Sequence, residues 1–390
     1  MTDPLPLTHD IINAWADDPK GPVALHLKQK LLPVEGDGGV IFPPTYADIG
    51  YNIDELSDGT KVCTIDSVGS QANRMEPIFK AAGSGEPENP LAKLVPQITI
   101  RLGNKPPVSI FDAGHRLGDA LVRASDLSEK AVEAFAAYQN GDSTPLARLA
   151  PTSLVFGAWD SRGEGAKLPR LVSSVVRARD IEILHRAALY SPAADFSMAD
   201  LLGPHEDDKA EKDARSALGF QHAPATWSPN DKIPEYKDGR PNVDRRIVGG
   251  IIANGEIVRD VTVNLIALRK LCGPDKVTLR EYILGLALVA ACFPQDGFLR
   301  QGCLLTLAPD SPAQWEEVNR NGLRTPISID AQSAGEFATN AARRFTVAMP
   351  SIFTFDSSRA REMLDEQKGG KKKKGKGKAD QPAGSEMPAG

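Results

Sequence analysis

The densest group of residues suited to binding a nucleic acid lies at residues 153–180, SLVFGAWDSRGEGAKLPRLVSSVVRARD. Its basic members, set against the single acid Glu164 between them, are Arg162, Lys167, Arg170, Arg177 and Arg179. Arginine binds phosphate bidentately, and the flexible turn 161–165 is able to follow a phosphate backbone closely. Phe156 and Trp159 precede the basic residues and are able to stack on an unpaired base. These residue types are those of a groove for single-stranded RNA.

The same residues also fit a purely structural role. Phe156 and Trp159 are side chains that a hydrophobic core accepts, and the arginines have many surplus carboxylates with which to pair. Composition leaves both interpretations open. A smaller basic group is more simply explained by salt bridges on a solvated face, and it consists of Arg240, Arg245 and Arg246.

A second candidate is SVGSQANRMEPIF, residues 67–79. Small and capping residues open it, and Ala72, Met75 and Phe79 follow at helical spacing, which predicts a loop that turns into a helix. The free amides of a helix N-terminus bind anions. The polar or small residues around this N-terminus are Ser67, Gly69, Ser70, Gln71, Asn73 and Arg74.

The sequence contains none of the common catalytic patterns. The zinc-protease, serine-hydrolase, P-loop and dinucleotide-binding signatures are all missing from it. Its histidines are scattered without metal-ligand spacing, and its acidic pairs fall in polar stretches where a solvated loop explains them. We therefore expect neither an enzyme nor a cofactor or metal site.

Composition predicts a soluble, cytoplasmic protein. Of the 390 residues 41% are hydrophobic, and the longest apolar stretch, 282–293, is too short to cross a bilayer. The N-terminal residues are acidic and lack the apolar core of a secretory signal. Widely spaced cysteines among apolar neighbours predict buried, reduced thiols, and these are Cys63, Cys272, Cys292 and Cys303.

Charge limits where a nucleic acid can bind. The net charge is −5, and removing the seven lysines at positions 368–378 from the 46 basic residues leaves 39 against 51 acidic ones, or −12. A nucleic-acid site must therefore be a local concentration of Arg and Lys on an acidic body. The Lys- and Gly-rich residues 361–390 are expected to be disordered, either as a solubilising tail or as a binder of nucleic acid that reads no sequence.

Strands and helices are interleaved along the rest of the chain, which predicts an α+β fold built on an antiparallel sheet. Strands are expected at 23–33, 61–65, 97–102, 108–111 and 299–307, and helices at 113–124, 128–138, 265–271, 278–293, 312–321 and 331–348. Asn254-Gly255 predicts a hairpin with a two-residue turn over 246–263. Segments 80–96 and 191–242 are interpreted as insertions into one domain, 1–360.

Two stretches resemble the signature sequences of a known family. DSVGSQANRMEP (66–77) and LVFGAWDSRGEGAKLPRLV (154–172) are similar to those of the Csb branch of the Cas-seven RAMP proteins. The resemblance extends through RRIVGG (245–250) and FLRQGCLL (298–305). That family is the guide-RNA backbone of type I-G, formerly I-U, CRISPR complexes. Its glycine-rich loop near the C-terminus is represented here only by Gly297 and Gly302.

The resemblance implies a modified RRM-like (ferredoxin-like) palm, helical finger insertions and a hairpin thumb. It implies a non-catalytic subunit of antiviral defence, whose copies stack as a helical filament along CRISPR guide RNA (crRNA) and present its spacer to target DNA. Other Cascade subunits and a helicase-nuclease are the further partners, with no membrane. The family's phosphate contacts map onto Ser67, Gly69, Ser70, Gln71, Asn73, Arg74, Arg162, Lys167 and Arg170, followed by Arg177 and Arg179.

Two other functions remain open. A RAMP endoribonuclease that processes precursor crRNA would use His115 or His185 as its acid-base residue. Alternatively, the chain is an interaction scaffold of which only the lysine tail touches nucleic acid. Related type III subunits cut RNA with a thumb aspartate, but we interpret Asp160 as an ion-pair partner of Arg162 or Lys167.

Overall fold

The structure, a computed structural model, describes residues 4–46, 49–160, 165–185, 188–190 and 248–365, and isolated positions between 211 and 241. Several parts singled out in the sequence lie outside the described residues: Arg162, Arg245, Arg246, most of the insertion 191–242, and the lysine-rich residues 366–390.

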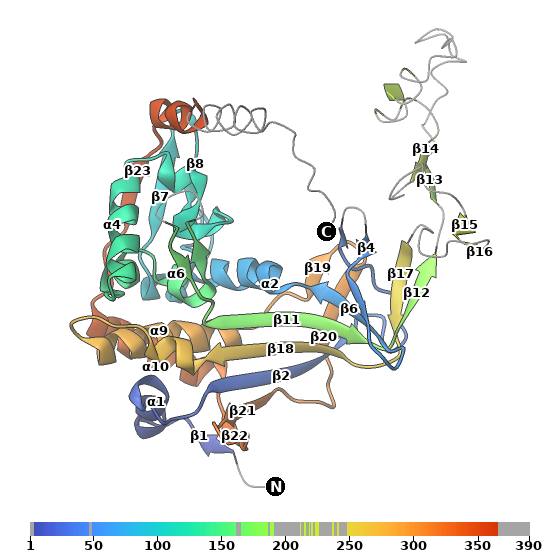
Figure 1. The fold of residues 1–390 in the computed structure, drawn as a ribbon, viewed down its shortest axis with the longest axis horizontal. Helices are drawn as coiled ribbons and strands as arrows, with labels where there is room; N and C mark the ends of the chain where they lie inside the picture. The colour runs from blue at the N-terminus through green and yellow to red at the C-terminus, as the bar shows by residue number, and fades with distance from the viewer. Residues whose placement is uncertain are drawn as a thin grey trace, which may run out of the picture.

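A large, mainly antiparallel sheet forms the centre of the fold, which is α+β as predicted (Figure 1). The strand order is β1-β22-β21-β2-β18-β11-β6-β5, and β20, paired with β19, joins the end of β2. The strands are β1 (Leu5–Pro6), β2 (Ala24–Pro33), β5 (Ile53–Glu55), β6 (Lys61–Asp66), β11 (Val172–Arg179), β18 (Ile257–Asn264), β19 (Phe298–Arg300), β20 (Cys303–Leu307), β21 (Gln314–Val318) and β22 (Arg324–Ser328).

Helices pack on one face of this sheet, where α2, α6 and α9 contact β11. The α-helices are α1 (His9–Asp17), α2 (Val68–Met75), α3 (Ala120–Arg123), α4 (Ser128–Gln139), α5 (Thr144–Leu149), α6 (Pro151–Phe156), α8 (Leu265–Arg269), α9 (Lys276–Cys292) and α10 (Ala331–Phe345). The 3-10 helices are η1 (Glu76–Phe79), η2 (Pro90–Leu94), η3 (Ile110–Asp112) and η4 (Arg116–Gly118). Strand residues alternate between this covered face and the opposite one, since the side-chain period of a strand is two.

Smaller sheets flank the central one. A three-stranded sheet contains β23 (Ser351–Thr354), β7 (Ile98–Leu102) and β8 (Lys105–Ser109). The strand pairs are β9 (Ala158–Trp159) with β10 (Lys167–Leu168), β12 (Ile181–His185) with β17 (Val248–Ala253), β3 (Thr45–Tyr46) with β4 (Gly50–Tyr51), β13 (Ala188–Tyr190) with β14 (Ala223–Ala225), and β15 (Tyr236–Lys237) with β16 (Arg240–Pro241).

The hairpin predicted across Asn254-Gly255 is wrong. β18 pairs with β11 and β2, whereas β17 pairs with β12, so that β11–β12 and β17–β18 form one long ribbon that bends (Figure 1). At the bend Asn254 and Gly255 donate their backbone N–H groups to the carbonyls of Asp180 and Arg179. Pairing with a strand that is distant in sequence has overridden the local turn preference.

Four other predicted elements differ in the structure. The strand expected at 108–111 is one of them, since β8 ends at Ser109 and η3 begins at Ile110. Residues 312–321, predicted to be helical, contain β21, which pairs with β2 and buries Trp315. Residues 113–124 form only the short helices η4 and α3. The strand expected at 299–307 is interrupted by a turn at Gly302, where φ is +77° and a side chain is disfavoured.

The cysteines are free thiols, but they are not all buried as predicted. Cys63 and Cys303 are buried, Cys292 is half-buried, and Cys272 is exposed. Burial raises the pKa of the Cys63 thiol to about 12 and that of Cys303 to about 11, so both stay protonated at neutral pH.

Two segments interpreted as lying outside the core contain ordered elements. In 80–96, η2 packs against α10, and the Leu94 carbonyl accepts a hydrogen bond from Tyr282 Oη at 2.8 Å. The last described residues, 357–365, form a helix. This helix crosses residue 361, where the disordered tail was expected to begin. Arg359 and Met363 of this helix line a pocket together with Asp160.

Alanine substitutions of two helical glycines, Gly285 in α9 and Gly335 in α10, are expected to have opposite effects on stability. A Cβ at Gly285 would lie 2.8 Å from the Cα of Ala338, whereas a Cβ at Gly335 would meet nothing within 4 Å. We expect Gly285→Ala to lower the free energy of unfolding by about 1–2 kcal/mol, because overpacking outweighs the gain in helix propensity. Gly335→Ala should raise it by about 0.5–1 kcal/mol. Urea unfolding of both variants measures this, and a stabilising Gly285→Ala would contradict the packing.

Candidate nucleic-acid interface

The first candidate motif forms the predicted loop and helix. β6 ends at the buried Asp66, and Ser67 then caps α2 by accepting a hydrogen bond from the Ser70 backbone N–H at 3.3 Å. Ala72 and Met75 bury the inner side of α2 in the core. Val68 and Gly69 of the first turn are half-buried, so the helix N-terminus, which favours anions, is partly accessible.

Arg170 of the second motif lies beside this N-terminus. A Cβ placed on Gly69 would be 3.9 Å from a terminal guanidinium nitrogen of Arg170. The Nε of the exposed Arg170 donates to the carbonyl of Phe156 at 3.1 Å, at the C-terminal end of α6. Gly157, with φ +78°, allows the Arg170 side chain to pack against its backbone. A Cβ at position 157 would lie 2.8 Å from the Arg170 Cγ. The Arg170 guanidinium thus lies beside the N-terminus of α2, and both groups favour anions.

A small strand pair continues the surface next to Arg170. Lys167 and Trp159 are partners in the β10–β9 register, and the Lys167 ammonium lies 5.6 Å from the centre of the Trp159 ring. Trp159 is 60% exposed, so its ring is available to stack on a base. Phe156 is not available, because it is fully buried in α6 beneath the Arg116 guanidinium.

Arg116 contacts residues of both motifs from the interior of the protein. It is buried, and its Nε lies 2.6 Å from the carboxylate of the equally buried Glu76. Its terminal nitrogens donate to Asn73 Oδ1 and to the Gly157 carbonyl, each at 3.3 Å. Burial lowers the Arg116 pKa, Glu76 opposes that change, and the positive charge of Arg170 adds to it. The buried pair therefore holds α2 and the Gly157 turn in one arrangement.

Two residues of the first motif face inward. Gln71 is fully buried, and its amide donates to Asp66 at 2.7 Å and accepts from the Ser174 hydroxyl at 2.6 Å. Arg74 is paired with Asp66 at 3.0 Å and also donates to the Leu299 carbonyl. Both residues anchor α2 to the sheet, whereas Asn73 is exposed.

Arg177 and Arg179 belong to the other face of the sheet. They alternate along β11 with Ser174, whose hydroxyl points to α2. Arg177 is half-buried and Arg179 is exposed. Acidic groups share their face, including Glu256, which is paired with Lys28 at 3.1 Å. The structure therefore does not bring these two arginines together with Arg170.

Asp160 is buried and forms an ion pair with Arg123 at 3.4 Å. Of the two predicted partners of Asp160, Lys167 has its ammonium over the Trp159 ring. Arg162, the other predicted partner, is outside the described residues. Among the described residues, no group of three His, Cys, Asp or Glu side chains is placed to hold a metal ion. Within that part of the chain, no helix is long and apolar enough to span a membrane.

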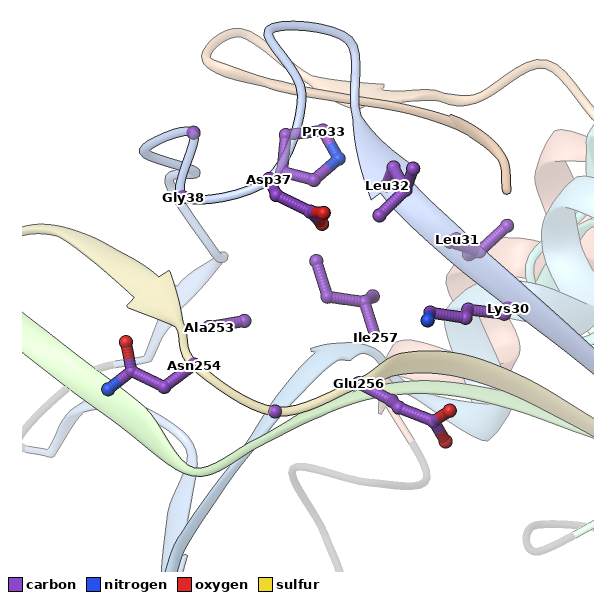
Figure 2. A pocket seen from close by; sticks show the side chains of 12 residues that line it. Lys30, Leu31, Leu32, Pro33, Asp37, Gly38, Ala253, Asn254, Glu256 and Ile257 are labelled. Atoms are coloured by element: carbon purple, nitrogen blue, oxygen red, sulfur yellow. The ribbon is translucent and has the colours of Figure 1, made fainter. Parts of the chain in front are cut away.

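A separate pocket of about 460 Å³ lies where the long ribbon bends, between the end of β2, residues 37–39 and residues 253–257 (Figure 2). Its charged lining is mixed and comprises Lys30, Asp37 and Glu256. Since both signs of charge are present, the lining selects neither an anion nor a cation, and we assign it no ligand.

The fold and site together define an α+β protein with a local cationic surface built from a helix N-terminus, an arginine and an exposed tryptophan. Residues 25–183, less than half of the chain, match the family of CRISPR-associated protein GSU0053. The matched segment runs from β2 through β11, so it contains both motifs of the candidate interface. No curated protein matches the chain. The family match supports a role in CRISPR defence.

Sequence reasoning missed two buried arginines that contact the first motif, Arg116 and Arg259. Arg116 stands in the segment 113–124, which was predicted to be helical, and the local pattern does not indicate its contacts with Asn73 and Glu76. The burial of Arg259 was predictable from the sequence. It alternates with Ile257 and Val261 on the inward side of strand β18, where an apolar residue is expected.

Proposed function

We propose that the chain is the non-catalytic guide-RNA backbone subunit of a type I CRISPR complex of the I-G kind. The observation that carries this proposal is the position of Arg170 beside the N-terminus of α2, with Trp159 and Lys167 next to it. Backbone amides and a guanidinium bind phosphate, and an exposed indole stacks on any base. None of these groups reads base identity, which suits a protein that must coat spacers of every sequence.

The strand order supports an RRM-like palm. The four central strands of the sheet, numbered in chain order, are β2 (first), β11 (second), β18 (third) and β21 (fourth). In the sheet they stand in the order fourth, first, third, second. All neighbouring pairs among them are antiparallel, and helices connect the first to the second and the third to the fourth. This order is the one expected of a ferredoxin-like palm, with β6 and β5 added beyond β11.

The bent ribbon supports a thumb at the insertion between the second and third strands. β12 and β17 continue the β11–β18 pair away from the helices, and residues 186–247 connect their ends (Figure 1). In an array of copies along crRNA, the ribbon of β12 and β17 is the part that contacts the neighbouring copy or the target strand. Other Cascade subunits and a helicase-nuclease complete the proposed complex.

The test is co-expression of the chain with a CRISPR array and its neighbouring genes, followed by sequencing of the RNA that co-purifies at increasing salt. We expect discrete guide-length RNA with the wild type and at least tenfold less with Arg170→Glu, as expected for a lost charged contact. Random RNA of all lengths with the wild type would contradict the proposal.

Two variants separate the rival functions. The candidate acid-base residues of an endoribonuclease are His115 and His185, and of these His115 is exposed. The backbone proposal expects His115→Ala to leave the length of the bound RNA unchanged, and precursor cleavage by the purified chain would favour the nuclease. Deleting residues 368–390 should preserve guide-RNA binding, whereas a scaffold that binds only through the lysine tail would lose it.

A further inference from the structure

A row of polar side chains crosses the helix-covered face of the sheet between two hydrophobic clusters. One cluster includes Val261 and Met75, and the other includes Ile257 and Val176. We call the row between them the polar seam, and it consists of Gln29, Arg259, Ser174, Gln71, Asp66 and Arg74. Its centre is Arg259, which is 5% exposed.

Among the described residues, no carboxylate neutralises the charge of Arg259. Its hydrogen-bond acceptors are neutral: Gln29 Oε1 at 2.6 Å, Ser174 Oγ at 3.1 Å, Gln71 Oε1 at 3.3 Å, the Ala291 carbonyl at 3.4 Å and Met75 Sδ at 3.5 Å. No carboxylate of the described residues lies within 4.0 Å of it. Burial lowers the Arg259 pKa only to about 10, so the cation persists at neutral pH.

The nearest thiol does not supply the missing negative charge. Burial raises the pKa of Cys292 to about 12, although Arg259 acts in the opposite direction. Cys292 is therefore a neutral thiol at pH 7. An isolated buried cation is costly, and a partner anion is the usual compensation.

A pocket of about 400 Å³ opens beside this cation, between β2, the end of α9 and residues 293–297. Arg259, Gln29 and Gln71 are among its lining residues. Gln295, on the outer loop, also lines it, and its Nε2 is buried without a hydrogen-bond partner. The pocket thus combines a cation without a neighbouring carboxylate and a donor without an acceptor. A group that carries negative charge and several acceptor oxygens would satisfy both.

We propose that this pocket binds a phosphate group, held by the Arg259 guanidinium and the Gln295 amide. The two donors come from independent elements, β18 and the loop after α9, and neither is used in the candidate nucleic-acid interface. The phosphate belongs either to a free nucleotide or to an RNA chain, since both present the same chemistry to these donors. Asp296 lines the pocket too, and its charge opposes the bound anion.

Calorimetric titration of the full chain with inorganic phosphate and with 5′-AMP, at constant ionic strength, tests the proposal. We expect saturable binding and a rise in Tm of about 2–4 °C at tenfold excess over Kd. Arg259→Met should lower the affinity by about 10- to 100-fold, and Asp296→Asn should raise it. Equal affinity in the wild type and Arg259→Met, or no binding to the wild type, overturns the proposal.

Gln295→Leu keeps the test valid if Arg259→Met fails to fold, because Gln295 lies on a surface loop. It should weaken phosphate binding with an unchanged circular dichroism spectrum, and unchanged binding overturns the role of the amide. A short single-stranded RNA then identifies the source of the phosphate. Displacement of 5′-AMP by that RNA assigns the pocket to an RNA phosphate, and simultaneous binding assigns it to a free nucleotide.

Discussion

Arg116→Gln is expected to lower the free energy of unfolding by about 3–5 kcal/mol at pH 7, because it leaves the Glu76 carboxylate buried and unpaired. Burial already raises the Glu76 pKa, although Arg116 and Thr152 oppose that rise. Without Arg116 the pKa of folded Glu76 rises further above its unfolded value. Denaturant unfolding at several pH values measures both effects.

The pH dependence has a definite sign. A carboxyl group whose pKa is raised on folding is protonated in the folded state while it is ionised in the unfolded state, so stability falls as pH rises between the two pKa values. The defect of Arg116→Gln should therefore shrink as the pH is lowered from 7 towards the unfolded pKa of Glu76. A defect of the same size at every pH would contradict an unpaired carboxylate as its cause.

Two controls accompany this variant. The double variant Glu76→Gln/Arg116→Gln removes both charges and should lose less stability than Arg116→Gln alone. Lys80→Gln breaks an ion pair with Asp112 that is largely exposed, and it should cost at most about 1 kcal/mol.

The double variant Lys167→Ala/Arg170→Ala is expected to weaken binding of a guide-length RNA by about 100-fold, as two charged contacts are lost. The slope of log K against log salt should fall by about 1.4, since each phosphate contact to a single strand contributes about 0.7. Fluorescence anisotropy at several salt concentrations gives both quantities. Stability should change little, because Lys167 and Arg170 are exposed.

The matched control for this prediction removes the same charge from the other face of the sheet. Arg177→Ala/Arg179→Ala should reduce the RNA affinity and the salt slope much less, because these side chains point away from α2. An equal loss in both double variants would show that general positive charge, and not the position of Arg170 at the helix N-terminus, determines binding.

Much of the local structure was predictable because it depends on neighbours in the sequence. The alternation in β2 and β6, the Ser67 cap and the apolar spacing of α2 each place an element within a residue or two. Helices α4, α9 and α10 were predictable for the same reason. The two signature motifs were likewise visible as short, contiguous patterns.

Contacts between residues distant in the sequence determined the elements that local patterns predicted wrongly. Asn254-Gly255 has the composition of a hairpin turn, but β11 and β12 lie alongside and make it a bend in a ribbon. Residues 312–321 became a strand because β2 offered a free edge for pairing. In both cases hydrogen bonds to a distant strand outweighed a local preference.

The sequence by itself determined that a nucleic-acid site must be local, because its positive charges are too few for a basic surface. It also determined which residue types are available for that site. Only the tertiary structure decided which of them act together: it set Arg170 against α2, directed Gln71 and Arg74 into the polar seam, and placed Arg177 and Arg179 on the opposite face. The reason is physical, since strand pairing and burial select one partner for each side chain from many that composition allows.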